Sequence, residues 1–271
     1  MPDLDRVARI IRATAAAEIM PRFCALEASD IREKKPGDLV TVADIAAERA
    51  LLAALAAEVP GSAALGEESV AEDPARLDLL AGGDPVWVID PIDGTGNFAK
   101  GVPRFAVIVA YVEQGVVTAG WIYHPPSDAM VMARAGGGAW RDGRRLTVVA
   151  GARGKDLIGS AYGRTAGGVR MAKALDESGR VGAIQNRGCS GIEYMELAEG
   201  ASHFSLHSRS LPWDHAAGMM IAAEAGGLAS FLDGSTYDPR VLDRKPLATA
   251  NAEAWRIIAE VAATPAPAGA G

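Results

Sequence analysis

The sequence predicts an α/β protein whose first half is of the α+β type. Between residues 86 and 141, short apolar runs are separated by glycine-containing turns, which predicts successive hairpin strands. From about Gly151 onward, strand-like runs alternate with helical runs, as is typical of α/β folds. We therefore expect two domains, an N-terminal one over 1–150 and a C-terminal one over 151–271.

Two helices are predicted ahead of the hairpin strands. Apolar residues at helical spacing predict the first over residues 3–26. The second follows a polar turn at 34–38 and ends before Pro60. Its expected core face comprises Ile45, Leu52, Leu55 and Val59.

The remaining elements follow from short apolar runs and from helical spacing. In the first half, strands are expected at 62–66, 86–89, 105–112, 116–123, 129–134 and 139–141, with a stretch of low apolarity at 69–74. In the second half, strands are expected at 157–161, 183–184, 203–206 and 228–231, and helices at 168–178, 192–198, 214–225 and 252–262.

Composition and charge restrict the class of protein. Hydrophobic residues make up 49% of the chain, which is typical of globular proteins, and the net charge of −7 argues against nucleic acid as a partner. No apolar run is long enough for a membrane span, and no signal peptide is evident. Two distant cysteines predict no disulfide framework, so we expect a reducing, cytoplasmic location. The Pro-, Ala- and Gly-rich end, 264–271, is expected to be a disordered tail.

The strongest chemical signal lies in residues 87–95, which have the sequence WVIDPIDGT. An apolar strand ends there in a carboxylate, and a proline and Gly94 then permit a sharp turn. Asp90 and Asp93 can therefore face one point beyond the strand, with the Ile92 carbonyl between them. Carboxylate and carbonyl oxygens are hard ligands that suit Mg²⁺ rather than zinc.

A helix or turn can begin directly after this segment. The N–H groups of Gly94 and Thr95 would then be available to accept a phosphate group. The alternative is an ordinary Asp-Gly turn after a strand, with Asp93 in solvent.

Three further acidic segments fit the same chemistry, and each has a structural alternative. Glu67 and Glu68 can supply a metal ligand and a water-activating group, although paired acids are mostly surface residues. Asp214 stands just before a predicted helix, where N-capping alone would explain it. Thr41 and Asp44 have the spacing of a capping box, and the Asp44 carboxylate can also approach a metal cluster.

Taken together, these segments resemble the inositol monophosphatase family of Mg²⁺-dependent, lithium-sensitive phosphomonoesterases. The matching runs, in the family's order, are DLVTVAD (38–44), GEE (66–68), DPIDGT (90–95) and the Trp-Asp pair at 213–214. The similarity continues through Asn97-Phe98, His124-Pro125 and EAGG (224–227), so it covers nearly the whole chain.

The resemblance implies a layered α-β-α-β-α sugar-phosphatase fold, a homodimer, and two or three Mg²⁺ ions in each active site. The implied metal ligands are Glu67, Asp90, Ile92, Asp93 and Asp214. The implied substrate contacts are Gly94, Thr95, Ser190, His207 and Asp214. The implied catalytic residues are Glu67, Thr95, Asp93 and Asp44. Glu67 and Thr95 would orient the attacking water. Asp44 would lie near a weaker third metal site, and lithium or excess Mg²⁺ would inhibit the enzyme by filling it.

Two departures from the family pattern fall near the expected pocket. Where inositol-specific members carry a glutamate six residues before the Trp-Asp pair, this sequence has His207, with Arg209 nearby. Gly96 stands where a second threonine is usual. We therefore expect intact phosphatase chemistry and an altered leaving-group pocket that is rich in hydrogen-bond donors, with either broad activity or a preference for a more anionic substrate.

The predicted activity is Mg²⁺-dependent hydrolysis of the phosphate monoester of a small metabolite. Adenosine 3′,5′-bisphosphate, histidinol phosphate and fructose 1,6-bisphosphate are the rival substrates to an inositol phosphate. A non-catalytic binding protein on the same scaffold is the alternative of a different class. The presence of every expected metal ligand argues against that alternative.

Overall fold

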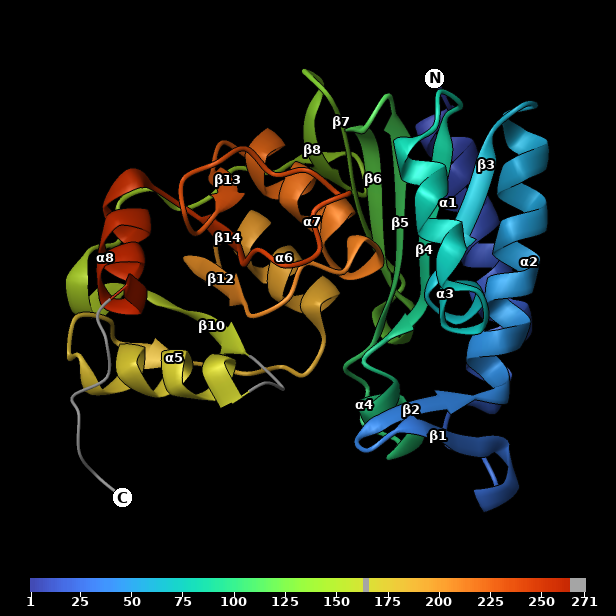
Figure 1. Cartoon of the computed structure of the whole chain (residues 1–271), viewed down its shortest axis with the longest axis horizontal. Helices are drawn as coiled ribbons and strands as arrows, with labels where there is room; N and C mark the ends of the chain where they lie inside the picture. Colours follow the sequence, from blue (N-terminus) through green and yellow to red (C-terminus); the bar gives the residue numbers. More distant parts are fainter. Residues whose placement is uncertain (163–165, 264–271) are drawn as a thin grey trace.

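The computed structural model describes residues 1–162 and 166–263, and in this part of the chain helices and sheets form alternating layers (Figure 1). The layers are, in order, α1 (Leu4–Thr14) with α2 (Val42–Glu58), a large sheet, α6 (Ser190–Ala198) with α7 (Pro212–Glu224), a small sheet, and α5 (Ala166–Glu177) with α8 (Ala252–Ala263). This confirms the expected α-β-α-β-α arrangement.

The large sheet contains β3 to β9, which lie side by side in chain order. Its strands are β3 (Ala63–Gly66), β4 (Val86–Asp93), β5 (Ala106–Glu113), β6 (Val116–His124), β7 (Ala129–Arg134), β8 (Gly138–Arg141) and β9 (Arg144–Arg145). β3 pairs with β4 in parallel, and the later neighbours are antiparallel. Gln114 and Gly115 have positive φ in the β5–β6 turn, as the predicted glycine-containing hairpin requires.

Both faces of the large sheet are apolar because successive side chains of a strand point to opposite faces. In β4, Trp87 and Ile89 belong to the core shared with α1 and α2. Val86 and Val88, one position away, belong to the core shared with α7. Burial of each such side chain contributes about 1.5–3 kcal/mol, so the continuous apolar run of β4 stabilises two layers at once.

The small sheet has the strand order β11-β10-β12-β14-β13. Its strands are β10 (Ile158–Tyr162), β11 (Ala183–Ile184), β12 (Phe204–His207), β13 (Leu228–Phe231) and β14 (Pro246–Thr249). β10, β11 and β12 are parallel, and β14 runs antiparallel between β12 and β13. The sequence did not predict β14. The step from β9 to β10 coincides with the expected boundary near residue 150, and the division into domains stays a prediction.

The first helix is shorter than expected. The α-helix ends at Thr14 and continues as a π-helical segment (Ala15–Ile19) and a 3-10 turn (Met20–Arg22). Pro21 lies in that turn, and a proline inside a helix removes one backbone donor and collides with the preceding turn. The prediction of one helix over 3–26 was therefore wrong at its end.

Three other segments differ from expectation. The polar turn at 34–38 is the tip of a hairpin made by β1 (Ile31–Lys35) and β2 (Asp38–Thr41), whose charged first strand gives no apolar signal. The stretch of low apolarity at 69–74, for which no element was predicted, is partly occupied by α3 (Glu67–Glu72). The buried face of α2 comprises Ala43, Asp44, Ala47, Glu48, Leu51 and Leu55. The face predicted from the sequence shares only Leu55 with it and omits the buried acids Asp44 and Glu48.

The other expectations concern the membrane, the cysteines and the end of the chain. Within 1–162 and 166–263, no helix has the length and apolar character needed to cross a bilayer. Cys24 and Cys189 are both free thiols, as expected. The tail predicted at 264–271 lies outside the described residues.

Candidate active site

The strand does not end at Asp90 as expected, because β4 continues to Asp93 with an irregularity in its pairing with β5 between Asp90 and Asp93, and the sharp turn comes at Gly94. Asp90 is buried, and its Oδ1 accepts the N–H of Ile92 at 3.0 Å. Gly94 has φ +89°, and a Cβ there would lie 2.9 Å from the Arg104 carbonyl oxygen, so only glycine fits easily. The short helix α4 (Thr95–Ala99) begins directly afterward, so of the helix or turn expected there the structure has a helix.

Parallel pairing brings two acids to one edge of the large sheet. Gly66 of β3 lies beside Ile89 of β4, so the next residues, Glu67 and Asp90, lie at the same edge. Glu67 is the first residue of α3, which begins where β3 ends. Two acidic segments that are separate in the sequence are therefore neighbours in the fold.

A third acid arrives from α7. One carboxylate oxygen each of Glu67, Asp90 and Asp214 lie within 4.8 Å of one another, and we call this group the carboxylate cluster. Burial raises the pKa of Asp90 well above its ordinary value, and the charges of Glu67, Asp93 and Asp214 raise it further. Like charges gathered this closely favour a bound cation, and their hard oxygens fit a divalent one such as Mg²⁺.

Asp214 occupies the first turn of α7 rather than its N-cap. The helix begins at Pro212, and Leu211 takes the N-cap position, so the capping alternative for Asp214 was wrong. Close packing sets the position of α7, since a Cβ at Gly120 of β6 would lie 3.0 Å from the Ala217 Cα.

Asp93 is directed toward the start of α6. Its Oδ2 accepts hydrogen bonds from the Gly191 N–H at 2.6 Å, the Ser190 hydroxyl at 3.0 Å and the Cys189 thiol at 3.1 Å. The Ser190 hydroxyl also lies 3.0 Å from the Asp214 carbonyl oxygen. Asp93 is therefore outside the carboxylate cluster but close enough for its charge to affect Asp90.

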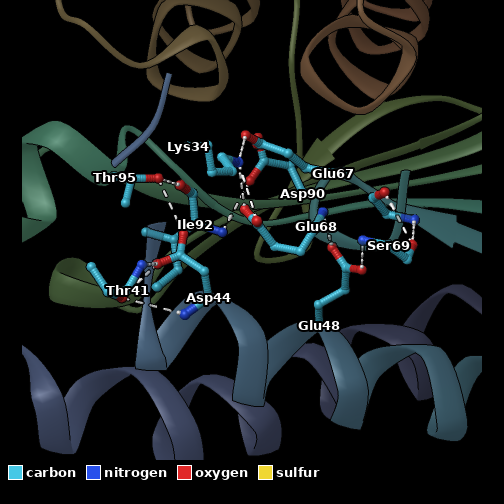
Figure 2. Close-up of polar contacts among 11 residues, drawn as sticks. Lys34, Thr41, Asp44, Glu48, Glu67, Glu68, Ser69, Asp90, Ile92 and Thr95 are labelled. Carbon is cyan, nitrogen blue, oxygen red and sulfur yellow. Dashed lines mark hydrogen bonds and ion pairs between the residues drawn. The ribbon is translucent and has the colours of Figure 1, made fainter. Parts of the chain in front are cut away.

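Asp44 is both a helix cap and a contact of Thr95 (Figure 2). Thr41 and Asp44 form the capping box of α2 that their spacing predicted. The Thr95 hydroxyl lies 3.1 Å from Asp44 Oδ1 and 3.0 Å from the Ile92 carbonyl oxygen, and its single proton can go to one of them. Burial raises the pKa of Asp44 to about 6, which its hydrogen bonds to Thr41 partly offset.

No pattern in the sequence indicated that Lys34 belongs to this site. Lys34 lies on β1, and its Nζ contacts Glu67 Oε1 at 2.7 Å and Glu68 Oε1 at 2.9 Å (Figure 2). Burial and then the charge of Glu67 raise the pKa of Glu68 to about 8. The hairpin that places Lys34 there was not predicted, so its lysine was assigned to a solvated turn.

Glu48 was also missed, although the sequence held a signal for it. It lies one helical turn after Asp44, so the two acids share the buried face of α2. Its carboxylate accepts the N–H groups of Glu68 and Ser69 at the start of α3, both at 2.7 Å (Figure 2). An acid pair at this spacing on an otherwise apolar face indicates a buried polar contact.

A cavity of about 710 Å³ lies over these residues. Of the predicted site residues, those that line it are Glu67, Asp90, Ile92, Asp93, Gly94, Thr95, Ser190, His207 and Asp214. Asp44 lies behind the lining and reaches it through Thr95. The structure thus brings the sequence-predicted residues to one cavity.

A buried polar group from the second half forms another part of the lining. We call Glu193, His207 and His215 the pocket wall. His207 Nε2 lies 2.7 Å from the Ser205 hydroxyl and 3.8 Å from Glu193 Oε2, and the two histidine rings are 4.4 Å apart. Burial lowers the pKa of His207 to about 4 and raises that of Glu193 to about 8.

Glu193 modifies the expectation for the pocket. The prediction of a donor-rich lining considered His207 and Arg209, both of which line the cavity. Glu193 adds a carboxyl group, which the sequence did not reveal because it lies within an unremarkable helix start. The lining therefore offers acceptors as well as donors.

Comparison with known proteins agrees with this arrangement. The family model described as "Inositol monophosphatase family" matches residues 3–266. The inositol-1-monophosphatase of Mesorhizobium japonicum is 34% identical over 208 residues, covering 74% of this chain and 75% of that protein. The fructose-1,6-bisphosphatase/inositol-1-monophosphatase of Thermotoga maritima is 32% identical over 204 residues, with 74% and 75% covered. A solved Thermotoga maritima structure described as an IMPase has a TM-score of 0.82 at 27% identity, with 96% of each chain covered.

Proposed function

The chain belongs to the inositol monophosphatase family and is a phosphoric monoester hydrolase, and from this we propose that it uses Mg²⁺ to hydrolyse the phosphate monoester of a small polyol or sugar. The observation that supports the metal is the carboxylate cluster of Glu67, Asp90 and Asp214. A set made of carboxylate oxygens fits Mg²⁺ better than zinc. We assign the Ile92 carbonyl and Asp93 as further ligands, for two or three ions in all.

The roles of the surrounding residues follow from their positions. Bound Mg²⁺ would neutralise phosphate charge and lower the pKa of a water molecule. Glu67, a member of the cluster, and Thr95 both line the cavity and would orient the attacking water. When the Thr95 hydroxyl donates its hydrogen bond to Asp44, its oxygen lone pairs are left to accept a hydrogen bond from that water.

The substrate would lie between two sets of residues. The N–H groups at the start of α4, near Gly94 and Thr95, would bind phosphate oxygens. Ser190, His207 and Glu193 line the cavity and would contact the leaving group. A lining with both donors and acceptors suits a leaving group that carries hydroxyls, such as a polyol or a sugar.

The test is phosphate release by the purified protein with and without Mg²⁺. The panel is inositol 1-phosphate, fructose 1,6-bisphosphate, adenosine 3′,5′-bisphosphate and histidinol phosphate. We expect release that stops when the metal is chelated and resumes when Mg²⁺ is restored. A folded protein that binds Mg²⁺ but releases phosphate from none of these substrates would contradict the proposal and favour a non-catalytic binding protein.

The assembly and the compartment stay predictions. The homodimer is implied by the family resemblance, and light scattering of the purified protein tests it. The cytoplasmic location rests on the cysteine content.

A further inference from the structure

We propose that Glu48 is a positioning residue that fixes Glu67 in the carboxylate cluster by holding the start of α3. The inference rests on the proposed function, because it concerns a residue assigned to bind metal. Glu48 does not line the cavity and does not contact the cluster itself. It would act through the backbone of α3.

Both oxygens of Glu48 are committed to that backbone (Figure 2). Oε2 accepts the N–H of Glu68 and Oε1 accepts the N–H of Ser69, each at 2.7 Å. The first N–H groups of a helix have no acceptor within the helix, and an ionised acceptor gives them strong hydrogen bonds. Glu48 is 3% exposed, so loss of these bonds would leave polar groups buried without partners.

The start of α3 depends on this external acceptor. The helix has six residues, too few to be stable by its own hydrogen bonds. Its N-cap residue is Gly66, which has no side chain to bind these N–H groups. A Cβ at Gly66 would collide with the Glu48 carboxylate, so glycine is what allows the carboxylate to approach.

The position of Glu67 follows from that of α3. Glu67 is the first residue of the helix and precedes the two held N–H groups directly. Glu67 Oε1 also contacts Lys34 at 2.7 Å, which alone would draw its side chain toward β1. With its backbone held from α2, Glu67 keeps an oxygen within 4.8 Å of those of Asp90 and Asp214.

The chain provides a matched control in Glu224. Its carboxylate also accepts two backbone N–H groups, those of Gly136 and Gly138, both at 2.7 Å. Gly136 lies in the β7–β8 turn and Gly138 is the first residue of β8, and neither lines the cavity. Glu48→Gln and Glu224→Gln therefore remove the same kind of interaction, near the cluster and away from it.

The experiment measures Mg²⁺ binding by titration calorimetry and backbone exchange of α3 by hydrogen–deuterium exchange. For Glu48→Gln we expect a dissociation constant roughly 10- to 100-fold higher, the range typical of outer-shell partners of metal ligands, and faster exchange at Glu68 and Ser69. For Glu224→Gln we expect wild-type binding. Should Glu48→Gln fail to fold, Glu48→Asp keeps the charge on a shorter side chain and serves the same comparison.

Two results would overturn the inference: wild-type Mg²⁺ affinity in the folded Glu48 variant, or an equal loss in Glu224→Gln. Failure of the wild-type protein to bind Mg²⁺ is a separate outcome. It would overturn the proposed function, and this inference with it.

Discussion

The carboxylate cluster and the pocket wall line one cavity but differ in charge: the cluster gathers carboxylates, whereas the pocket wall holds a neutral histidine. In the cluster, Glu67, Asp90 and Asp214 bring like charges together, and the pKa of buried Asp90 rises as a result. In the pocket wall, His207 is held neutral by burial and has the Ser205 hydroxyl as a partner. The like charges of the cluster favour binding of a cation, whereas His207 of the pocket wall has a hydrogen-bond partner within the protein. Chemistry and selectivity can therefore be altered separately.

The largest effect should come from Asp93, which links the two regions. Asp93→Asn keeps the size and an acceptor for the Gly191 N–H but removes the charge, so turnover should fall by orders of magnitude with the fold retained. Steady-state kinetics and circular dichroism measure both. Asp233→Asn, at an exposed acid outside the cavity lining, is the control. Wild-type turnover in folded Asp93→Asn would show that Asp93 has only a structural role, through its hydrogen bonds to α6.

The pocket wall should control stability at acid pH. The unfolded chain protonates His207 near pH 6.5, but the folded protein does so only near pH 4. The contribution of neutral His207 is therefore present above pH 6.5 and is lost as pH falls toward 4, by about 3 kcal/mol of unfolding free energy. His215 shifts in the same direction, while Glu193 adds stability that is full below pH 4.5 and lost as pH rises through 8.

Urea denaturation of the wild type and of His207→Asn between pH 4 and 7 measures this contribution. The comparison uses the slope of stability against pH, so a uniform loss of stability in the variant does not interfere. We expect the free energy of unfolding to rise less between pH 4 and 7 in the variant than in the wild type, because the variant lacks the contribution of His207. Parallel curves would show that His207 does not make the acid-sensitive contribution.

A smaller effect is expected at Thr95, which belongs to the cluster side. Thr95→Ala removes the hydroxyl near Asp44, and turnover should fall roughly 10- to 100-fold with less change in the Michaelis constant. Thr95→Ser restores a hydroxyl and should recover most of the loss. If only the Michaelis constant changed, Thr95 would be a phosphate contact and would not orient water.

The smallest effect is expected for selectivity. In His207→Asn, the ratio of kcat/KM between inositol 1-phosphate and fructose 1,6-bisphosphate should change by roughly tenfold or less, as expected for one altered polar contact. A phosphate ester with a leaving group that bears no hydroxyls should be hydrolysed as by the wild type. An unchanged ratio would place the selectivity outside the pocket wall.

The elements that the sequence predicted differ from those it did not predict in the strength of their local signal. Strands such as β4 and β7 were predicted because apolar runs end at turn-forming residues. Glu67 was found because it follows the apolar run of β3, and Asp90 was found because it follows the apolar run at 86–89 of β4. The charged strand β1 lacks such a signal, and β14 follows a long loop.

The residues that were missed share a physical reason. Lys34, Glu48 and Glu193 act through partners distant in the chain, and their surroundings exist only after the layers pack. Local spacing therefore identified the groups proposed to hold metal, but not the groups that position them or complete the pocket. Glu48 alone had a local signal, its separation of one helical turn from buried Asp44.

The middle layer has a consequence for synthesis of the protein on the ribosome. The large sheet is complete at Arg145, but α7, which covers one of its faces and brings Asp214 to the cluster, spans Pro212–Glu224. A nascent chain must therefore expose an apolar sheet face for some time, which is a risk for aggregation. It also cannot assemble the full cluster before α7 emerges. A chain ending before Pro212 should bind a dye specific for exposed apolar surface, and failure to bind it would show that another segment covers the sheet first.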